Sequence, residues 1–139
     1  MTMQAVLSAD PLNVFAQTPF MRLLGMQRDY SAGGKAQMSL EPNADLGNVI
    51  GAVHGGVVVT LLDVVMASAA VSIIDFAKTV VTLNLTTSFV EPGRGKLIAQ
   101  GEVVQYDQDV AWCTAQVRDA QGRLVAQAQA SFRYLPRPV

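Results

Sequence analysis

Residues 47–63 have the sequence GNVIGAVHGGVVVTLLD, and the apolar run that begins inside this stretch continues to Ile74. The run is too long for one strand, and Ala67-Ser68-Ala69-Ala70 favours a helix over a strand. We therefore predict a helix from about Gly55 to Ile74, apolar on nearly every side and for that reason buried on nearly every side. Its one carboxylate, Asp63, is costly to bury unless it has a use. Asp63 is therefore the first candidate for a functional residue.

Strands are predicted on both sides of this helix. Before it, Lys35–Glu41 alternates apolar and polar residues, and Met26–Glu41 as a whole is expected to form two strand pieces. After it come four further strand candidates without another helix, namely Val80–Val90, Lys96–Tyr106, Val110–Asp119 and Arg123–Tyr134. The expected fold class is α+β, an antiparallel sheet of about five to six strands wrapped around one long central helix.

Alternation within two of these strands predicts which side chains face the helix. In Val80–Val90, strict alternation places Leu85 and Phe89 on one face and Thr82 on the other. In the last strand, the small residues Ala126, Ala128 and Ala130 share a face with Phe132, and they would let a helix approach closely.

The N-terminal 25 residues are expected to form a short helical leader to a single domain that spans residues 1–139. Asp10-Pro11-Leu12 is typical of a helix start, and Thr18-Pro19 is expected to end that helix. Phe20–Gly25 predicts a second short turn, with Gly25 as its stop.

Composition excludes several classes of protein. Half of the residues are hydrophobic and 15% are charged, which predicts a packed fold. The net charge of −1 and the absence of a basic stripe argue against nucleic acid as a partner. The single cysteine, Cys113, excludes an internal disulfide and a multi-cysteine metal site, and we expect it in the core. Without a secretory pattern in Met1–Pro11, and with Asp63 inside the apolar run, we expect a cytoplasmic protein that does not cross a membrane.

The spacing of polar residues around the helix start is similar to that of a known protein family. Asn48 is followed after five residues by His54-Gly55-Gly56, and Asp63 follows after six more. This pattern resembles the signature of hot-dog-fold acyl-CoA thioesterases, and more narrowly the phenylacetic acid degradation-related (PaaI-like) branch. The similarity also covers Thr18–Met26 and Val81–Pro92. It implies a hot-dog fold and hydrolysis of acyl-CoA or aroyl-CoA thioesters, with no metal and no cofactor.

The chemistry of such a hydrolysis can be assigned to residues. A helix start offers free N–H groups and a partial positive charge, and glycine lets a carbonyl come close. We assign the backbone N–H of Gly55 to the oxyanion hole, as the resemblance also implies. Asp63 would act as a general base on water, or would attack directly to give a mixed anhydride. The sequence leaves these two mechanisms open.

Further roles follow from the resemblance. It implies that Asn48 orients the water or the thioester carbonyl, and that the Thr82 hydroxyl lies near the aspartate. It also implies a pocket built across the interface of a homodimer, with a homotetramer as a dimer of such dimers. His54, included among the catalytic candidates, is expected mainly to shape the turn. Gly56 would lie against the substrate.

Phosphate groups of coenzyme A would need basic residues near the pocket. Arg94 is our first candidate for this contact and Lys96 is the second.

Each assignment has a structural alternative. Asp63 could bond across a dimer, Asn48 could brace its loop, and Gly55-Gly56 could serve tight packing. Arg94 and Lys96 could be solvated surface residues. Two other functions also stay open, namely an acyl-CoA-binding module without turnover and a hot-dog hydratase or dehydratase acting on enoyl or hydroxyacyl thioesters. The hydratase class normally uses a histidine with a carboxylate in a different local pattern.

Overall fold

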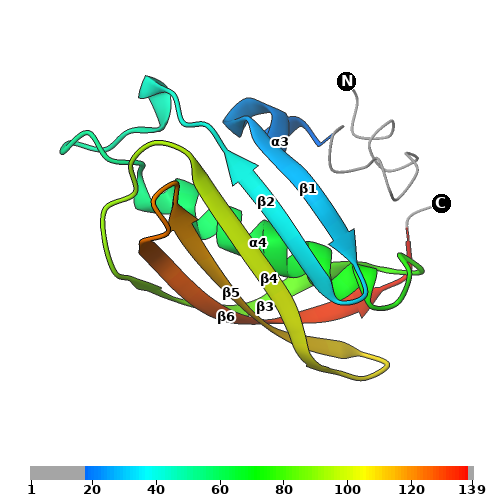
Figure 1. Cartoon of the computed structure of the whole chain (residues 1–139). Helices are drawn as coiled ribbons and strands as arrows, with labels where there is room; N and C mark the ends of the chain where they lie inside the picture. The colour runs from blue at the N-terminus through cyan, green and yellow to red at the C-terminus, as the bar shows by residue number, and fades with distance from the viewer. Residues whose placement is uncertain (1–17, 138–139) are drawn as a thin grey trace.

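Six antiparallel strands wrap around one long helix in the computed structural model, which describes residues 18–137 (Figure 1). In chain order the elements are α3 (Pro19–Leu24), β1 (Met26–Ala32), β2 (Lys35–Leu40), a 3-10 turn (Ala44–Leu46), α4 (Gly55–Ser72), β3 (Thr79–Phe89), β4 (Leu97–Tyr106), β5 (Val110–Asp119) and β6 (Leu124–Leu135). The strand order in the sheet is β1-β2-β4-β5-β6-β3, so β1 and β3 are the edges. The predicted α+β architecture is confirmed, and each predicted strand is present within one or two residues of its expected ends.

Small side chains let α4 lie directly on the inner face of the sheet. Gly101 on β4 pairs with Ala115 on β5, which pairs in turn with Ala128 on β6. A Cβ added to Gly101 would lie 3.2 Å from the carbonyl group of Val65 on α4. A larger residue here would therefore push the helix away from the sheet. By length and composition α4 could also cross a membrane, but its apolar character is explained by this packing.

Burial of α4 is one-sided, which corrects the expectation of burial on nearly every side. Ten of its residues are buried against the sheet. Val59, Val64, Ala67 and Val71 remain partly exposed, because one curved sheet covers only part of the surface of a helix. This partly exposed stripe also includes Asp63.

A β-bulge in β3 corrects the predicted facing of that strand. The register with β6 shifts between Thr82 and Asn84, so Leu83 is an extra residue on β3. Because a bulge resets the two-residue alternation, Thr82 reaches α4 even though Leu85 also packs against the core. Strict alternation had placed these two side chains on opposite faces.

The leader differs from its prediction in one detail. Thr18 and Pro19 begin a helix, with Pro19 at its first turn, where a missing N–H costs nothing. Gly25 ends α3 with φ of 74°, as expected of a left-handed C-terminal cap. The helix start predicted at Asp10-Pro11 lies outside the described residues.

The β5–β6 turn is held by one buried carboxylate. Asp119 Oδ1 accepts hydrogen bonds from the backbone N–H groups of Gln121 and Arg123. Its Oδ2 lies 3.0 Å from the Arg123 guanidinium. Burial acts to raise the pKa of Asp119, but these hydrogen bonds and the positive charge outweigh it, so the pKa is lowered from its ordinary value.

Candidate active site

The start of α4 presents one backbone donor that has no partner among the described residues. His54 is the N-cap, and its Nδ1 accepts a hydrogen bond of 2.9 Å from the N–H of Gly56. The N–H groups of Val57 and Val58 both donate to the carbonyl of His54. Among residues 18–137, the N–H of Gly55 has no hydrogen-bond partner. Gly55 can therefore donate to a bound oxygen, as the sequence suggested.

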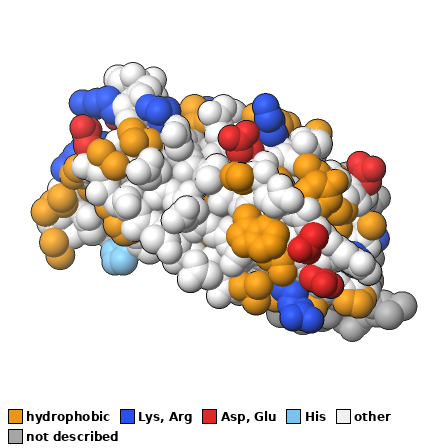
Figure 2. Space-filling model, turned by 90° about the horizontal axis from the view of Figure 1, so that it is seen from below, with side chains coloured by type: hydrophobic (Ala, Val, Ile, Leu, Met, Phe, Trp, Pro, Cys, Tyr) orange, Lys and Arg blue, Asp and Glu red, His pale blue; other side chains and the backbone are white. Residues whose placement is uncertain are grey.

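His54 and Gly56 form a matched pair at this helix start. A Cβ on Gly56 would lie only 3.1 Å from the Nδ1 of His54, so glycine makes room for the cap. The imidazole itself is exposed, and the chain's one histidine protrudes at the edge of the face shown in Figure 2. This geometry fits the expectation that His54 shapes the turn, because Nδ1 is already engaged.

Asn48 organises the loop that leads into α4. Its Oδ1 accepts hydrogen bonds from the N–H groups of Ile50 and Ala52, at 3.1 and 3.0 Å. Its own N–H donates to the carbonyl of Ala52. The side-chain oxygen is thus used by the loop, and any orienting of a water or carbonyl falls to the side-chain NH2 group.

Asp63 and Thr82 are brought together across the helix and the sheet. The hydroxyl of Thr82 on β3 donates to Asp63 Oδ1 on α4 over 2.7 Å. Asp63 is partly exposed and Thr82 is exposed, so the pair is open to solvent along the edge strand. A carboxylate fixed by one hydroxyl keeps its second oxygen free to act on a water or an acyl carbon.

Gly55 and Asp63 lie far apart within one chain. They are separated by eight residues of a continuous helix, which corresponds to about 12 Å along its axis. An oxygen accepting from Gly55 would stand about 2.9 Å from the nitrogen. A reacting atom lies about 3–3.5 Å from its nucleophile, so donor and nucleophile of one thioester are at most about 7 Å apart. The rise along the helix therefore exceeds the reach of direct attack by Asp63 on a carbonyl held at Gly55 of the same subunit.

Phe89 is a neighbour of Gly55 that the sequence did not indicate. Two carbons of its ring lie 3.4 and 3.5 Å from the position of a Cβ on Gly55. The two residues are distant in sequence, and no motif or periodicity links them. The side chain of Phe89 is 57% exposed at the end of β3.

The two basic residues selected for coenzyme A lie in different surroundings. Arg94 reaches the loop before α4, where its Nη2 lies 3.3 Å from the carbonyl oxygen of Ile50. Lys96 is exposed just before β4. Arg94 is thus the one of the two that the structure ties to the candidate site.

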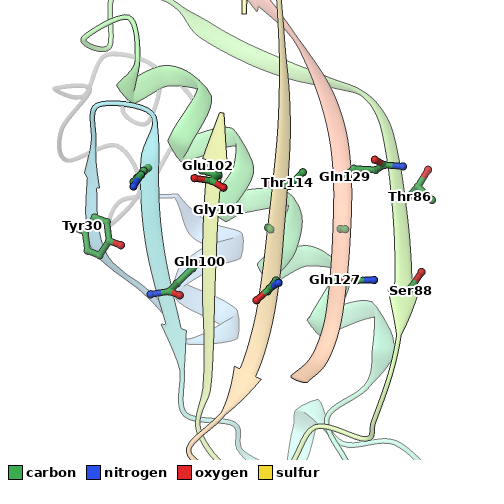
Figure 3. A pocket seen from close by; sticks show the side chains of 13 residues that line it. Tyr30, Thr86, Ser88, Gln100, Gly101, Glu102, Thr114, Gln127 and Gln129 are labelled. Atoms are coloured by element: carbon green, nitrogen blue, oxygen red, sulfur yellow. The ribbon is translucent and has the colours of Figure 1, made fainter. Parts of the chain in front are cut away.

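A separate hollow of about 720 Å³ lies on the outer face of the sheet, away from α4 (Figure 3). Its lining is mainly uncharged and polar, with side chains such as Gln100, Thr114, Gln127 and Gln129. It contains none of the predicted site residues. This hollow and the pair formed by Asp63 and Thr82 are therefore on opposite faces of the sheet.

Cys113 lies in the core as expected. Its thiol is buried and contacts the carbonyl of Met66 at 3.7 Å. Burial raises the pKa of Cys113 to about 12, so it is a poor nucleophile. Among the described residues, no group of three or more His, Cys, Asp or Glu side chains is placed to hold a metal ion.

Known proteins with the same fold agree with the resemblance seen in the sequence. A family model of the thioesterase superfamily matches residues 50–126. A protein of Halobacterium salinarum, provisionally named an esterase, is 30% identical over 124 residues, which cover 81% of this chain and 82% of that protein.

Solved structures support the same assignment. A conserved protein of Pseudomonas aeruginosa has a TM-score of 0.81 and 28% identity, with 85% of this chain and 94% of that one covered. A thioesterase family protein of Silicibacter pomeroyi has a TM-score of 0.85 and 25% identity, with coverage of 91% and 96%. The helix wrapped by a six-stranded sheet is the hot-dog fold, and the chain belongs to the thioesterase superfamily.

Proposed function

We propose that this protein hydrolyses acyl-CoA thioesters to a carboxylic acid and free coenzyme A. The observation that carries the proposal is the carboxylate of Asp63, held by the hydroxyl of Thr82 on the central helix of a thioesterase-superfamily fold. The reaction needs a carboxylate that activates water or attacks the acyl carbon, and a donor for the oxyanion. It needs no metal and no redox cofactor.

The N–H of Gly55, which has no partner within residues 18–137, is the oxyanion donor in this proposal. It points from a helix start, where the partial positive charge of the helix favours the negative oxygen of the tetrahedral intermediate. Asp63 then acts either as general base or as nucleophile. In the second case its oxygen forms a mixed anhydride as the thiolate leaves, and water releases the acid.

The site is proposed to form between two subunits. About 12 Å along α4 separate Gly55 from Asp63, against the roughly 7 Å that direct attack by the carboxylate can span. Gly55 of one subunit would therefore work with an aspartate of the other. An interface that brings these two positions together also covers the partly exposed stripe of α4.

The edge strand β3 is the proposed contact between subunits. It is 11 residues long and exposes Val81 and Leu83 at 45% and 55%. An exposed edge of this length, with apolar side chains, is a template for pairing with another strand. A two-fold axis beside β3 would join two sheets and place Thr82 near the seam. We further propose a homotetramer built from two such dimers.

Finer assignments rest on the sequence motif. From the resemblance carried by the spacing from Asn48 to Asp63, we propose that the chain belongs to the phenylacetic acid degradation-related branch of the superfamily. Arg94, which contacts the loop before α4, is the proposed contact for coenzyme A phosphate, with Lys96 as a second cation. A cytoplasmic location fits a substrate of this kind.

The first experiment measures thiol release from a panel of acyl-CoA and aroyl-CoA substrates. We expect Asp63→Ala and Asp63→Asn to lose nearly all activity on the best substrate. Asp75→Asn is the matched control, since it makes the same chemical change just beyond the other end of α4. Equal rates for wild type and both Asp63 variants would refute the role of this carboxylate. Tight acyl-CoA binding without hydrolysis by the wild type would instead indicate a binding module.

A second experiment tests whether the site is shared. Asp63→Asn subunits are unfolded and refolded together with Gly55→Pro subunits, whose oxyanion donor is absent. A shared site predicts recovery to about a quarter of wild-type activity, because half of the dimers are mixed and each has one intact site. A site within one subunit predicts no recovery.

A further inference from the structure

The ring of Phe89 stands beside the proposed oxyanion donor. In a helix both the N–H of the first residue and its Cα–Cβ direction point toward the N-terminal end. Ring carbons at 3.4 and 3.5 Å from the Cβ position of Gly55 therefore flank the opening into which its N–H points. Apart from the two chain neighbours of Gly55 and the nearby backbone of α4, no other atom of the described residues comes within 4 Å of that position.

The backbone that holds this ring is fixed. Phe89 pairs with Ala126 on β6. The next two residues, Val90 and Glu91, both donate their N–H groups to the carbonyl of Val125. The ring therefore cannot be moved away from Gly55 by a shift of a free loop.

A thioester whose oxygen accepts from Gly55 would have its carbonyl group beside this ring. Its carbonyl oxygen would lie about 2.9 Å from the nitrogen of Gly55. The α-carbon of the acyl group is bonded to the same carbonyl carbon, so substituents on it share the space beside the ring. We infer that Phe89 is the residue that limits the width of the acyl group at its α-carbon. Unbranched and planar acyl groups pass the ring, and α-branched groups collide with it.

The inference rests on the proposed function, because it assumes that Gly55 receives the thioester oxygen. It assigns Phe89 a part in substrate selection that is separate from the chemistry of Asp63. Exposure of Phe89 in the single chain could also reflect contact with a second copy, and the experiment below distinguishes these two roles.

The test compares kcat/KM for butyryl-CoA and isobutyryl-CoA, which have the same atoms and differ only in branching at the α-carbon. We expect wild type to prefer the straight chain. Phe89→Ala should raise the relative kcat/KM of the branched substrate by about tenfold or more, the scale of one methyl group in an apolar pocket. Phe89→Leu keeps most of the apolar volume and should shift the ratio in the same direction by a smaller factor.

Leu83→Ala is the matched control, since Leu83 is similarly exposed on the same strand and belongs to the proposed subunit contact, but lies six residues before Phe89. Sedimentation at the assay concentration reports the oligomeric state of every variant. An unchanged substrate ratio in Phe89→Ala and Phe89→Leu overturns the inference, and so does an equal shift in Leu83→Ala. If Phe89→Ala does not fold, the ratio for Phe89→Leu decides. A wild type that hydrolyses neither this pair nor any other thioester refutes the proposed function itself, and the inference falls with it.

Discussion

Replacement of Gly55 by proline removes the proposed oxyanion donor and puts the Cδ of the proline ring in the place of its hydrogen. The first turn of a helix tolerates proline, because its N–H has no partner within the helix. The residue before a proline must be extended, and His54 already has ψ of 138°. Since the N–H of Gly55 has no partner among the described residues, the substitution breaks no hydrogen bond of the described fold. We therefore expect the variant to fold.

The expected loss follows from the chemistry of the donor. Removing one oxyanion donor typically lowers kcat by about 100- to 1000-fold, equivalent to about 2.7–4 kcal/mol of transition-state stabilisation. The same change should leave the free energy of unfolding within about 1 kcal/mol of wild type, because proline at a compatible position also restricts the unfolded chain.

Gly55→Ala is the matched control for this variant. It adds a Cβ at the same place, 3.4 Å from the ring of Phe89, and keeps the N–H. The assay is steady-state thiol release at saturating substrate, with thermal unfolding measured on the same samples. If the kcat of folded Gly55→Pro is within about threefold of that of Gly55→Ala, the N–H of Gly55 contributes less than about 1 kcal/mol to transition-state stabilisation. The N–H is then not the oxyanion donor.

Other predictions concern single contacts of the structure. Thr82→Val removes the 2.7 Å hydrogen bond to Asp63 and should lower kcat by about tenfold or more, with rescue by Thr82→Ser; equal kcat for valine and serine would contradict this. His54→Ala should lower the free energy of unfolding by about 1 kcal/mol in urea titrations, whereas His54→Asn, a good N-cap, should keep it. Because the pKa of Cys113 is about 12, only about one thiol in 10,000 is ionised at pH 8, so iodoacetamide should label the protein only when it is unfolded. The lowered pKa of Asp119 stabilises the fold above its ordinary value of 3.8, and this contribution is lost as the pH falls through the lower folded-state value. The melting temperature of wild type should therefore fall more steeply between about pH 5 and about pH 2 than that of Asp119→Asn.

Most of the fold could be predicted from patterns within short segments. Alternation located the strands, and length located the helix, because each depends on which side of one element is buried. The alanines of β6 also predicted a face packed against the helix, and Ala126, Ala128 and Ala130 are buried in the core that also contains α4. The predicted burial of α4 was too high, because the buried fraction of the helix depends on how far the sheet curves around it.

From the sequence, site residues could be predicted only where they belong to a motif. Asn48, Gly55 and Asp63 were selected by spacing, and the structure places Asn48 and Gly55 in one loop-and-helix start. Phe89 was missed because its contact with Gly55 joins two segments distant in sequence. Thr18-Pro19 was misassigned because proline is found both after a helix and in its first turn.

The extra residue at Leu83 has a consequence for comparing relatives of this chain. A relative without it would still pair Thr82 with Phe132 and Asn84 with Ser131, so the hydroxyl would still face α4. Two relatives can therefore hold the aspartate by the same contact and yet differ by one in the number of residues between the hydroxyl and the core-facing Leu85. The pairing of the hydroxyl residue with β6 is therefore a more informative criterion than spacing along the chain when active members of the superfamily are sought.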